Sequence, residues 1–171
     1  MRGWRPGRRA TLASWSLAWR FGGEAVVAGL GIGVVWVATS PGLPDAGLSD
    51  ARIDRNLGLL TLLWLVLRGV GTIVMVPIAE ELAFRGFLHR WLISRRFEAV
   101  PFRQISLMAL LVSSALFGVL HDRWLAGALS GAVFAVLMNR SGRLSDPVAA
   151  HMTANAVIFV WAVVAWKPWL L

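Results

Sequence analysis

The chain contains no cysteine and no tyrosine, and only 15% of its 171 residues are charged. Without cysteine there is no disulfide framework, no thiolate ligand for a metal and no cysteine nucleophile. The low charged fraction accompanies a hydrophobic content of 57%, and the apolar residues occur in long runs. This composition is too apolar for a soluble domain of this size, so it predicts a protein that crosses a membrane several times.

The aromatic and basic residues agree with a membrane location. Ten tryptophans indicate interfacial anchors made of indole rings. The formal net charge of +8 comes largely from arginines grouped between apolar runs, as the positive-inside rule describes. No soluble basic domain exists that could carry nucleic-acid binding, so nucleic acid is not an expected partner.

The apolar runs predict an all-α fold, a polytopic bundle of about five to six transmembrane helices. A helix of mixed polarity is also expected over 78–97, and Pro77 should bend or break the helix just before it. We divide the chain into 1–56, a basic lead-in with the first membrane helix and a loop, and a core over 57–171. The expected spans are approximately 21–37, 57–76, 104–120, 124–138 and 148–166.

The distribution of Lys and Arg predicts the orientation. Twelve fall in segments that would lie inside and four in segments outside, which favours a multi-pass protein of the cell (inner, cytoplasmic) membrane with a cytoplasmic N-terminus. This arrangement puts Glu80 and His151 near the inner face but His121 near the outer one. For the three to meet, either the helix after Pro77 re-enters the bilayer or the span before His121 is bent or short.

Two carboxylates and an arginine follow Pro77, and ionisable groups at membrane depth are costly and are functional candidates. Glu81 and Arg85 are four residues apart, so they share a helix face and are predicted to form an ion pair. Glu80 lies about 100° around the helix, which leaves it free to act as a general base. His89 lies among arginines and is predicted to be interfacial.

Two further pairs have the same spacing of four residues, Phe117 with His121 and His151 with Asn155. A base, two imidazoles and an amide suit activation of a water and stabilisation of an oxyanion, which is the chemistry of amide hydrolysis. Each pair alone has a structural alternative, because intramembrane histidines and asparagines also serve as hydrogen-bonded helix contacts.

Taken in order, these three motifs resemble those of the CAAX-protease and bacteriocin-processing family of intramembrane proteases, also called Abi or CAAX prenyl protease 2-like. The resemblance covers about 71–160 and extends to the phrase Glu80-Glu81-Leu82-Ala83-Phe84-Arg85-Gly86. It implies that Glu80 and His121 activate the attacking water and that His151 and Asn155 stabilise the oxyanion. Glu81, Arg85 and Phe117 would support the site.

The resemblance leaves two mechanisms open, because members have been called metalloproteases and also metal-independent glutamate proteases. One glutamate and two histidines form a known zinc set, which would here be Glu80, His121 and His151. The chain lacks His-Glu-x-x-His, and Asn155 suits an oxyanion donor. We therefore favour a site without cofactor, with zinc as the alternative.

The expected substrate is a membrane-associated protein or peptide in the lipid bilayer. The chain is shorter than eight-span members of the family, so we expect substrate-guiding helices to be either missing or supplied by a partner membrane protein. The alternative function is a non-catalytic membrane immunity or scaffold protein, in which the polar cluster serves helix packing or partner binding.

Overall fold

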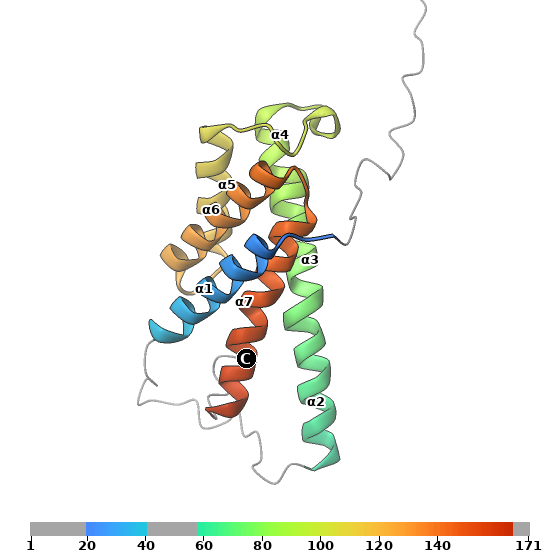
Figure 1. The fold of residues 1–171 in the computed structure, drawn as a ribbon, viewed down its shortest axis with the longest axis vertical. Coiled ribbons are helices and arrows are strands. Elements are labelled where there is room, and N and C mark those ends of the chain that lie inside the picture. The colour runs from blue at the N-terminus through green and yellow to red at the C-terminus, as the bar shows by residue number, and fades with distance from the viewer. Residues whose placement is uncertain (1–19, 41–57, 166–171) are drawn as a thin grey trace, which may run out of the picture.

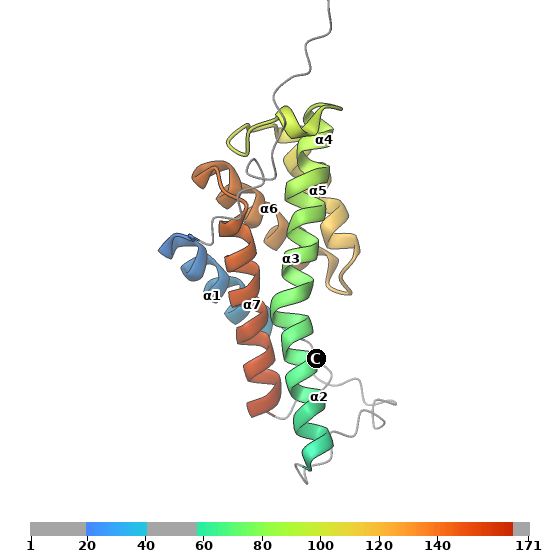
Figure 2. The same ribbon diagram turned by 90° about the vertical axis from the view of Figure 1, so that its right-hand side faces the viewer.

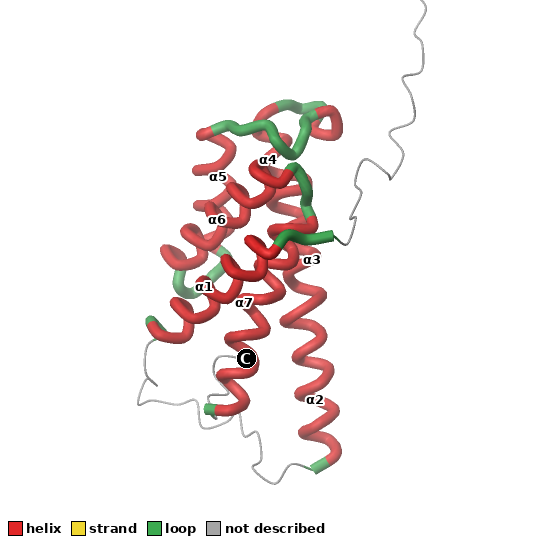
Figure 3. The backbone as a smooth tube through the Cα atoms, in the orientation of Figure 1, coloured by secondary structure: helices red, strands yellow, loops and turns green. Residues whose placement is uncertain are grey.

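The computed structural model describes residues 20–40 and 58–165, and the predicted basic lead-in and first loop lie largely outside these ranges. Within them the chain is built of helices and loops, without strands (Figure 3). The elements are α1 (Gly23–Ala38), α2 (Leu59–Val70), the π-helical η2 (Gly71–Met75), α3 (Val76–Glu81), the π-helical η3 (Leu82–Leu88), α4 (His89–Ile93), a short 3₁₀ turn η4 (Phe97–Ala99), α5 (Leu107–Val119), α6 (Trp124–Ser141) and α7 (Ser145–Val164).

The segments from α2 to α4 form one continuous helix of 35 residues, Leu59–Ile93 (Figure 2). The irregularity expected near Pro77 is present as the two π-helical stretches on either side of it, and the helix is not interrupted. The backbone N–H of Val76 donates to the carbonyl of Gly71, five residues earlier, as in a π-helix. In this pattern the next carbonyl, that of Thr72, would pair with residue 77, but proline has no N–H. The helix therefore continues past Pro77 by leaving one carbonyl for a donor from elsewhere.

Helix α1 crosses α7 at close range (Figure 1), and glycines make this approach possible. A Cβ at Gly29 would lie 2.3 Å from the carbonyl oxygen of Ala150, and one at Gly33 would lie 2.7 Å from Cβ of Val157. Two glycines four residues apart form the Gly-x-x-x-Gly arrangement that lets membrane helices pack backbone to backbone. This packing holds α1 against the helix that carries His151.

Helix α5 is short for a membrane helix. Its 13 residues span about 20 Å, against about 30 Å for the hydrocarbon core of a bilayer. The chain then turns through residues 120–123 and returns as α6 (Figure 1), so this turn lies partway along the bundle. His121 is in the turn. Of the two arrangements that could bring His121 to the other motifs, the structure has the short span.

The outer surface of the bundle is strongly apolar, as expected for contact with lipid. Leu60 is 82% exposed and Val164 is 77% exposed. The segments Leu59–Ile93 and Ser145–Val164 are long and apolar enough to cross a membrane.

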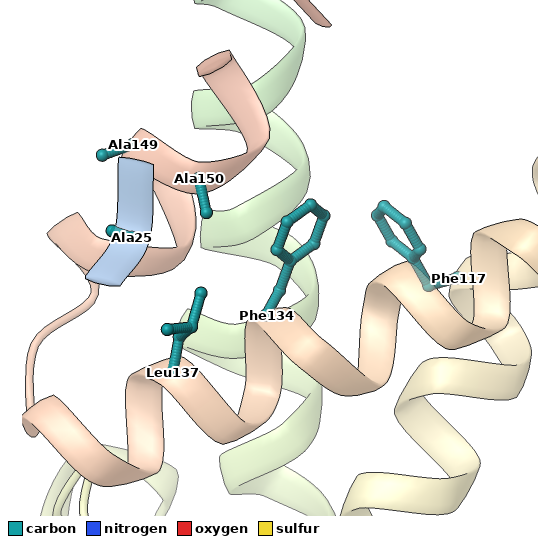
Figure 4. Close-up of a cluster of buried hydrophobic side chains, with 6 residues drawn as sticks. All are labelled: Ala25, Phe117, Phe134, Leu137, Ala149 and Ala150. Atoms are coloured by element: carbon teal, nitrogen blue, oxygen red, sulfur yellow. The ribbon is translucent and has the colours of Figure 1, made fainter. Parts of the chain in front are cut away.

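A small apolar cluster fills the place where α1, α5, α6 and α7 meet (Figure 4); its members are Ala25, Phe117, Phe134, Leu137, Ala149 and Ala150. The predicted class, a helical membrane bundle, is confirmed, while the N-terminal orientation and the boundary at residue 57 stay predictions.

Candidate active site

The four predicted catalytic residues line one cavity of about 200 Å³. Glu80 comes from α3, His121 from the turn after α5, and His151 and Asn155 from α7. The remaining wall is mostly apolar and comprises Ile32, Trp36, Thr72, Val76, Phe117, Ser130, Phe134, Ala154, Ile158 and Phe159. The structure therefore brings together, on one cavity, residues that are up to 75 positions apart in the sequence.

Behind the cavity, Glu81 and Arg85 form the predicted ion pair, and both side chains are fully buried. Arg85 Nε lies 3.2 Å from Glu81 Oε2, and Nη1 donates to Oε1 at 3.2 Å. Arg85 Nη2 donates to the carbonyl of Gly131 at 2.7 Å, and its guanidinium carbon lies 4.3 Å from the centre of the Phe117 ring. Buried charges are tolerated when they are paired and hydrogen-bonded in this way. The pair also ties the long helix to α6.

His151 connects this ion pair to the cavity. Its Nδ1 lies 3.0 Å from Glu81 Oε1, and because a carboxylate accepts, Nδ1 is the donor. Its Nε2 lies 3.9 Å from Glu80 Oε2, a buried oxygen without a hydrogen-bond partner among the described residues. Phe134 stacks on the imidazole with 4.9 Å between ring centres. Glu81 therefore orients His151 as well as pairing with Arg85, a role that the spacing of the motif does not indicate.

The ring of His121 is held by the residue one helical turn before it. Its Nδ1 lies 2.8 Å from the carbonyl oxygen of Phe117, and the two rings are 4.7 Å apart. A carbonyl can only accept, so Nδ1 carries a proton, and in the neutral imidazole Nε2 then presents its lone pair. His121 can thus accept a hydrogen bond or a proton through Nε2.

Asn155 fills the gap that Pro77 leaves in the long helix. Its Nδ2 donates to the carbonyl oxygen of Thr72 at 2.8 Å, the carbonyl that the proline cannot satisfy. Polar side chains of neighbouring helices commonly take over backbone groups freed by proline in membrane helices. A side-chain amide has two N–H donors, so one donor of Asn155 remains for the cavity that it lines.

The interfacial position predicted for His89 is wrong. Its side chain is fully buried, and Nδ1 lies 3.3 Å from the hydroxyl oxygen of Ser113. The prediction assumed that the neighbouring arginines face water, but Arg85 and Arg90 are themselves buried. Arg90 donates to backbone carbonyls around the loop after α4, including that of Val100 at 2.9 Å. An arginine that is buried and donates to backbone carbonyls does not indicate that its neighbours lie at the membrane–water interface.

Zinc, the alternative cofactor, needs three side-chain ligands gathered around one point. In residues 20–40 and 58–165 no group of three His, Cys, Asp or Glu side chains has that arrangement. The hydrogen bond from His151 Nδ1 to Glu81 leaves Nε2 free, as in many metal-binding histidines, so the choice between a site without cofactor and a zinc site stays a prediction.

Comparisons with known proteins agree with the three motifs. No curated protein and no solved structure matches the chain. Residues 62–157, more than half of the chain, match the family described as type II CAAX prenyl endopeptidase Rce1-like. The matched segment contains all three motifs, so the family expected from them is confirmed. The chain is a membrane protein, and it belongs to the Rce1-like family of type II CAAX prenyl endopeptidases.

Proposed function

We propose that this protein is an intramembrane endopeptidase that hydrolyses a peptide bond of a membrane-associated protein or peptide. Membership of the family supports a CAAX-type intramembrane protease at the level of the family. The observation that supports the catalytic proposal is the convergence of Glu80, His121, His151 and Asn155 on one cavity. Its polar groups can serve both the attacking water and the oxyanion, as amide hydrolysis requires.

In the proposed mechanism, a water between Glu80 and His121 attacks the carbonyl carbon of the scissile bond. Glu80 Oε2, which has no partner among the described residues, takes a proton from the water as general base. The lone pair on His121 Nε2 accepts the other hydrogen bond of the water. As the carbon–nitrogen bond breaks, the proton on Glu80 passes to the leaving amine.

His151 and Asn155 are the proposed oxyanion donors. Nε2 of His151 faces Glu80 Oε2 at 3.9 Å, and a proton on Nε2 makes this contact attractive. In this state His151 is protonated on both nitrogens, with Nδ1–H held by Glu81. Donors that are already oriented before reaction stabilise a developing negative charge most effectively, and the Glu81–Arg85 pair supplies that orientation.

The test compares membranes of cells that express the wild-type protein, Glu80→Gln or Glu24→Gln. Glu24 is the matched control because its side chain, on α1, is 70% exposed and pairs with Arg140 at 3.6 Å, away from the cavity. Profiling of protein N-termini should show uncleaved membrane proteins accumulating with Glu80→Gln, and normal cleavage with Glu24→Gln. Full cleavage by Glu80→Gln would overturn the assignment of the base. Cleavage in detergent should also continue in the presence of a zinc chelator.

One observation favours the non-catalytic alternative. The hydrogen bond of Asn155 to the Thr72 carbonyl is a helix-packing contact, as expected of a scaffold protein. Cells that lack the protein are added to the comparison, because that alternative predicts an identical set of membrane-protein N-termini with and without the protein, whereas a protease with a different base predicts a difference. The experiment above therefore separates the two functions.

A further inference from the structure

Arg123, two residues after His121, reaches the C-terminal end of α1. Its Nη1 donates to the carbonyl of Trp36 at 2.7 Å and to the hydroxyl of Ser40 at 3.3 Å. Its Nη2 donates to the hydroxyl of Thr39. The guanidinium carbon also lies 4.8 Å from the centre of the Trp36 ring. One side chain thus joins the turn between α5 and α6 to the end of α1.

The end of α1 has a physical requirement for this contact. The last carbonyls of a helix lack intrahelical donors and form the negative end of the helix dipole. Helix α1 has no basic residue in its own last turn, so the cation comes from Arg123. The carbonyl of Trp36 accepts a hydrogen bond from this guanidinium and another from the hydroxyl of Ser40, each at 2.7 Å. The contact therefore provides a donor for a carbonyl at the end of α1 and acceptors for the guanidinium of Arg123.

Trp36 extends this contact to His121. The two rings meet edge to face with 5.9 Å between their centres, while Phe117 holds the imidazole from another side. Gly127 closes a third side, since a Cβ there would lie 3.2 Å from Cβ and Cγ of His121. With Nδ1 engaged and these sides closed, Nε2 is the nitrogen left for the cavity.

We propose that Arg123 is a positioning residue that clamps the end of α1, so that Trp36 packs against His121 and the imidazole keeps its orientation. The importance of this clamp for hydrolysis rests on the proposed function, whereas the clamp itself is a statement about structure. Helix α1 precedes the segment 62–157 that matches the family. In this chain, a helix outside that segment therefore completes the site by supplying the Trp36 wall of the cavity.

Nuclear magnetic resonance of protein labelled with ¹⁵N-histidine, in detergent micelles, tests the clamp without a substrate. The chain has three histidines, so each ring can be followed separately. The wild-type protein should show His121 with its proton on Nδ1. Arg123→Lys keeps the charge but cannot reproduce the forked contacts of a guanidinium. The His121 signal should therefore change while those of His89 and His151 do not.

Arg140→Ala is the control, because it removes an arginine whose side chain is 69% exposed and should leave all three histidine signals in place. Trp36→Phe keeps an aromatic ring against His121, so it should preserve the Nδ1–H state, whereas Trp36→Ala should alter the His121 signal as Arg123→Lys does. A His121 signal that is identical in Arg123→Lys and the wild type would overturn the clamp.

A kinetic experiment uses a substrate identified by the Glu80→Gln comparison. Arg123→Lys should lower kcat on the order of 10- to 100-fold, because small displacements of a catalytic group have effects of this size, with KM nearly unchanged. Cleavage that depends on Glu80 but not on Arg123 would refute the positioning role and leave the proposed function intact. If cells with and without the protein have the same membrane-protein N-termini while Arg123→Lys still changes the His121 signal, the proposed function fails and the clamp stands.

Discussion

Replacing Asn155 with alanine should destabilise the protein for a reason that lies in Pro77. The carbonyl of Thr72 has lost its helical donor to the proline, and Asn155 Nδ2 supplies the replacement at 2.8 Å. Removing that donor leaves a carbonyl unpaired between membrane helices. Loss of such a hydrogen bond should lower the free energy of unfolding by about 1–2 kcal/mol, given the values measured for soluble and membrane proteins.

Pro77→Ala provides the second arm of a double-mutant cycle. Alanine restores a backbone N–H at residue 77, which can satisfy the Thr72 carbonyl within the helix. In this background Asn155→Ala should cost less than about 0.5 kcal/mol, so the coupling between the two positions is about 1 kcal/mol. Any effect of losing the proline ring is common to both Pro77→Ala proteins and cancels in the cycle.

The cycle can be measured by thermal unfolding in detergent, followed by circular dichroism. For a chain of this length, 1 kcal/mol corresponds to a change in Tm of roughly 2–4 °C. The Asn155→Ala protein should therefore melt several degrees below the wild type, and the double variant should melt close to Pro77→Ala. Equal losses in both backgrounds would refute the proposed link between the proline and the amide.

The same four proteins separate the two roles of Asn155. If its second N–H donates to the oxyanion, the double variant will be stable yet slow, with kcat lower on the order of 10²- to 10³-fold, the usual effect of losing one such donor. If Asn155 only packs helices, cleavage will recover along with stability. Stability and activity thus move apart in the first case and together in the second.

The remaining predictions concern packing and the buried ion pair. Gly29→Ala should cost about 1–3 kcal/mol of stability, because its Cβ would lie 2.3 Å from the Ala150 carbonyl oxygen, whereas Gly31→Ala has nothing within 4 Å and should be neutral or slightly stabilising. Similar losses of Tm in both variants would contradict close packing of α1 on α7. Arg85→Ala removes the guanidinium that pairs with the buried Glu81 carboxylate and leaves that carboxylate the hydrogen bond from His151 Nδ1, which should cost about 3–5 kcal/mol; a Tm within a degree of the wild type would contradict this role.

Features that depend on neighbours along a helix could be predicted from the sequence. The Glu81–Arg85 ion pair follows from a spacing of four residues, and the divergence of Glu80 from Glu81 follows from about 100° of rotation per residue. The apolar runs likewise locate the membrane helices. The order of the three motifs was enough to predict the family, because the order along the sequence does not depend on how the chain folds between the motifs.

Features that depend on packing between distant segments could not be predicted. The spacing of residues does not show that Glu81 would meet His151, 70 positions later, or that Trp36 would form a wall of the cavity. The continuity of the helix through Pro77 depends on a donor from α7, so the local rule for proline could not decide it. The position of His89 could not be predicted for a similar reason, since its side chain meets Ser113 on α5, 24 positions later.

The two π-helical stretches on either side of α3 bear on how this helix can change length in evolution. A turn closed by i to i+5 bonds holds one residue more than an α-helical turn, and it absorbs that residue without rotating the segments beyond it. Deleting one residue within 71–75 or 82–88 should therefore leave both glutamates facing as they do now. A deletion inside Val76–Glu81 would turn Glu80 by about 100°, away from the cavity. Insertions and deletions in relatives should accumulate at the wide turns and avoid the segment between them.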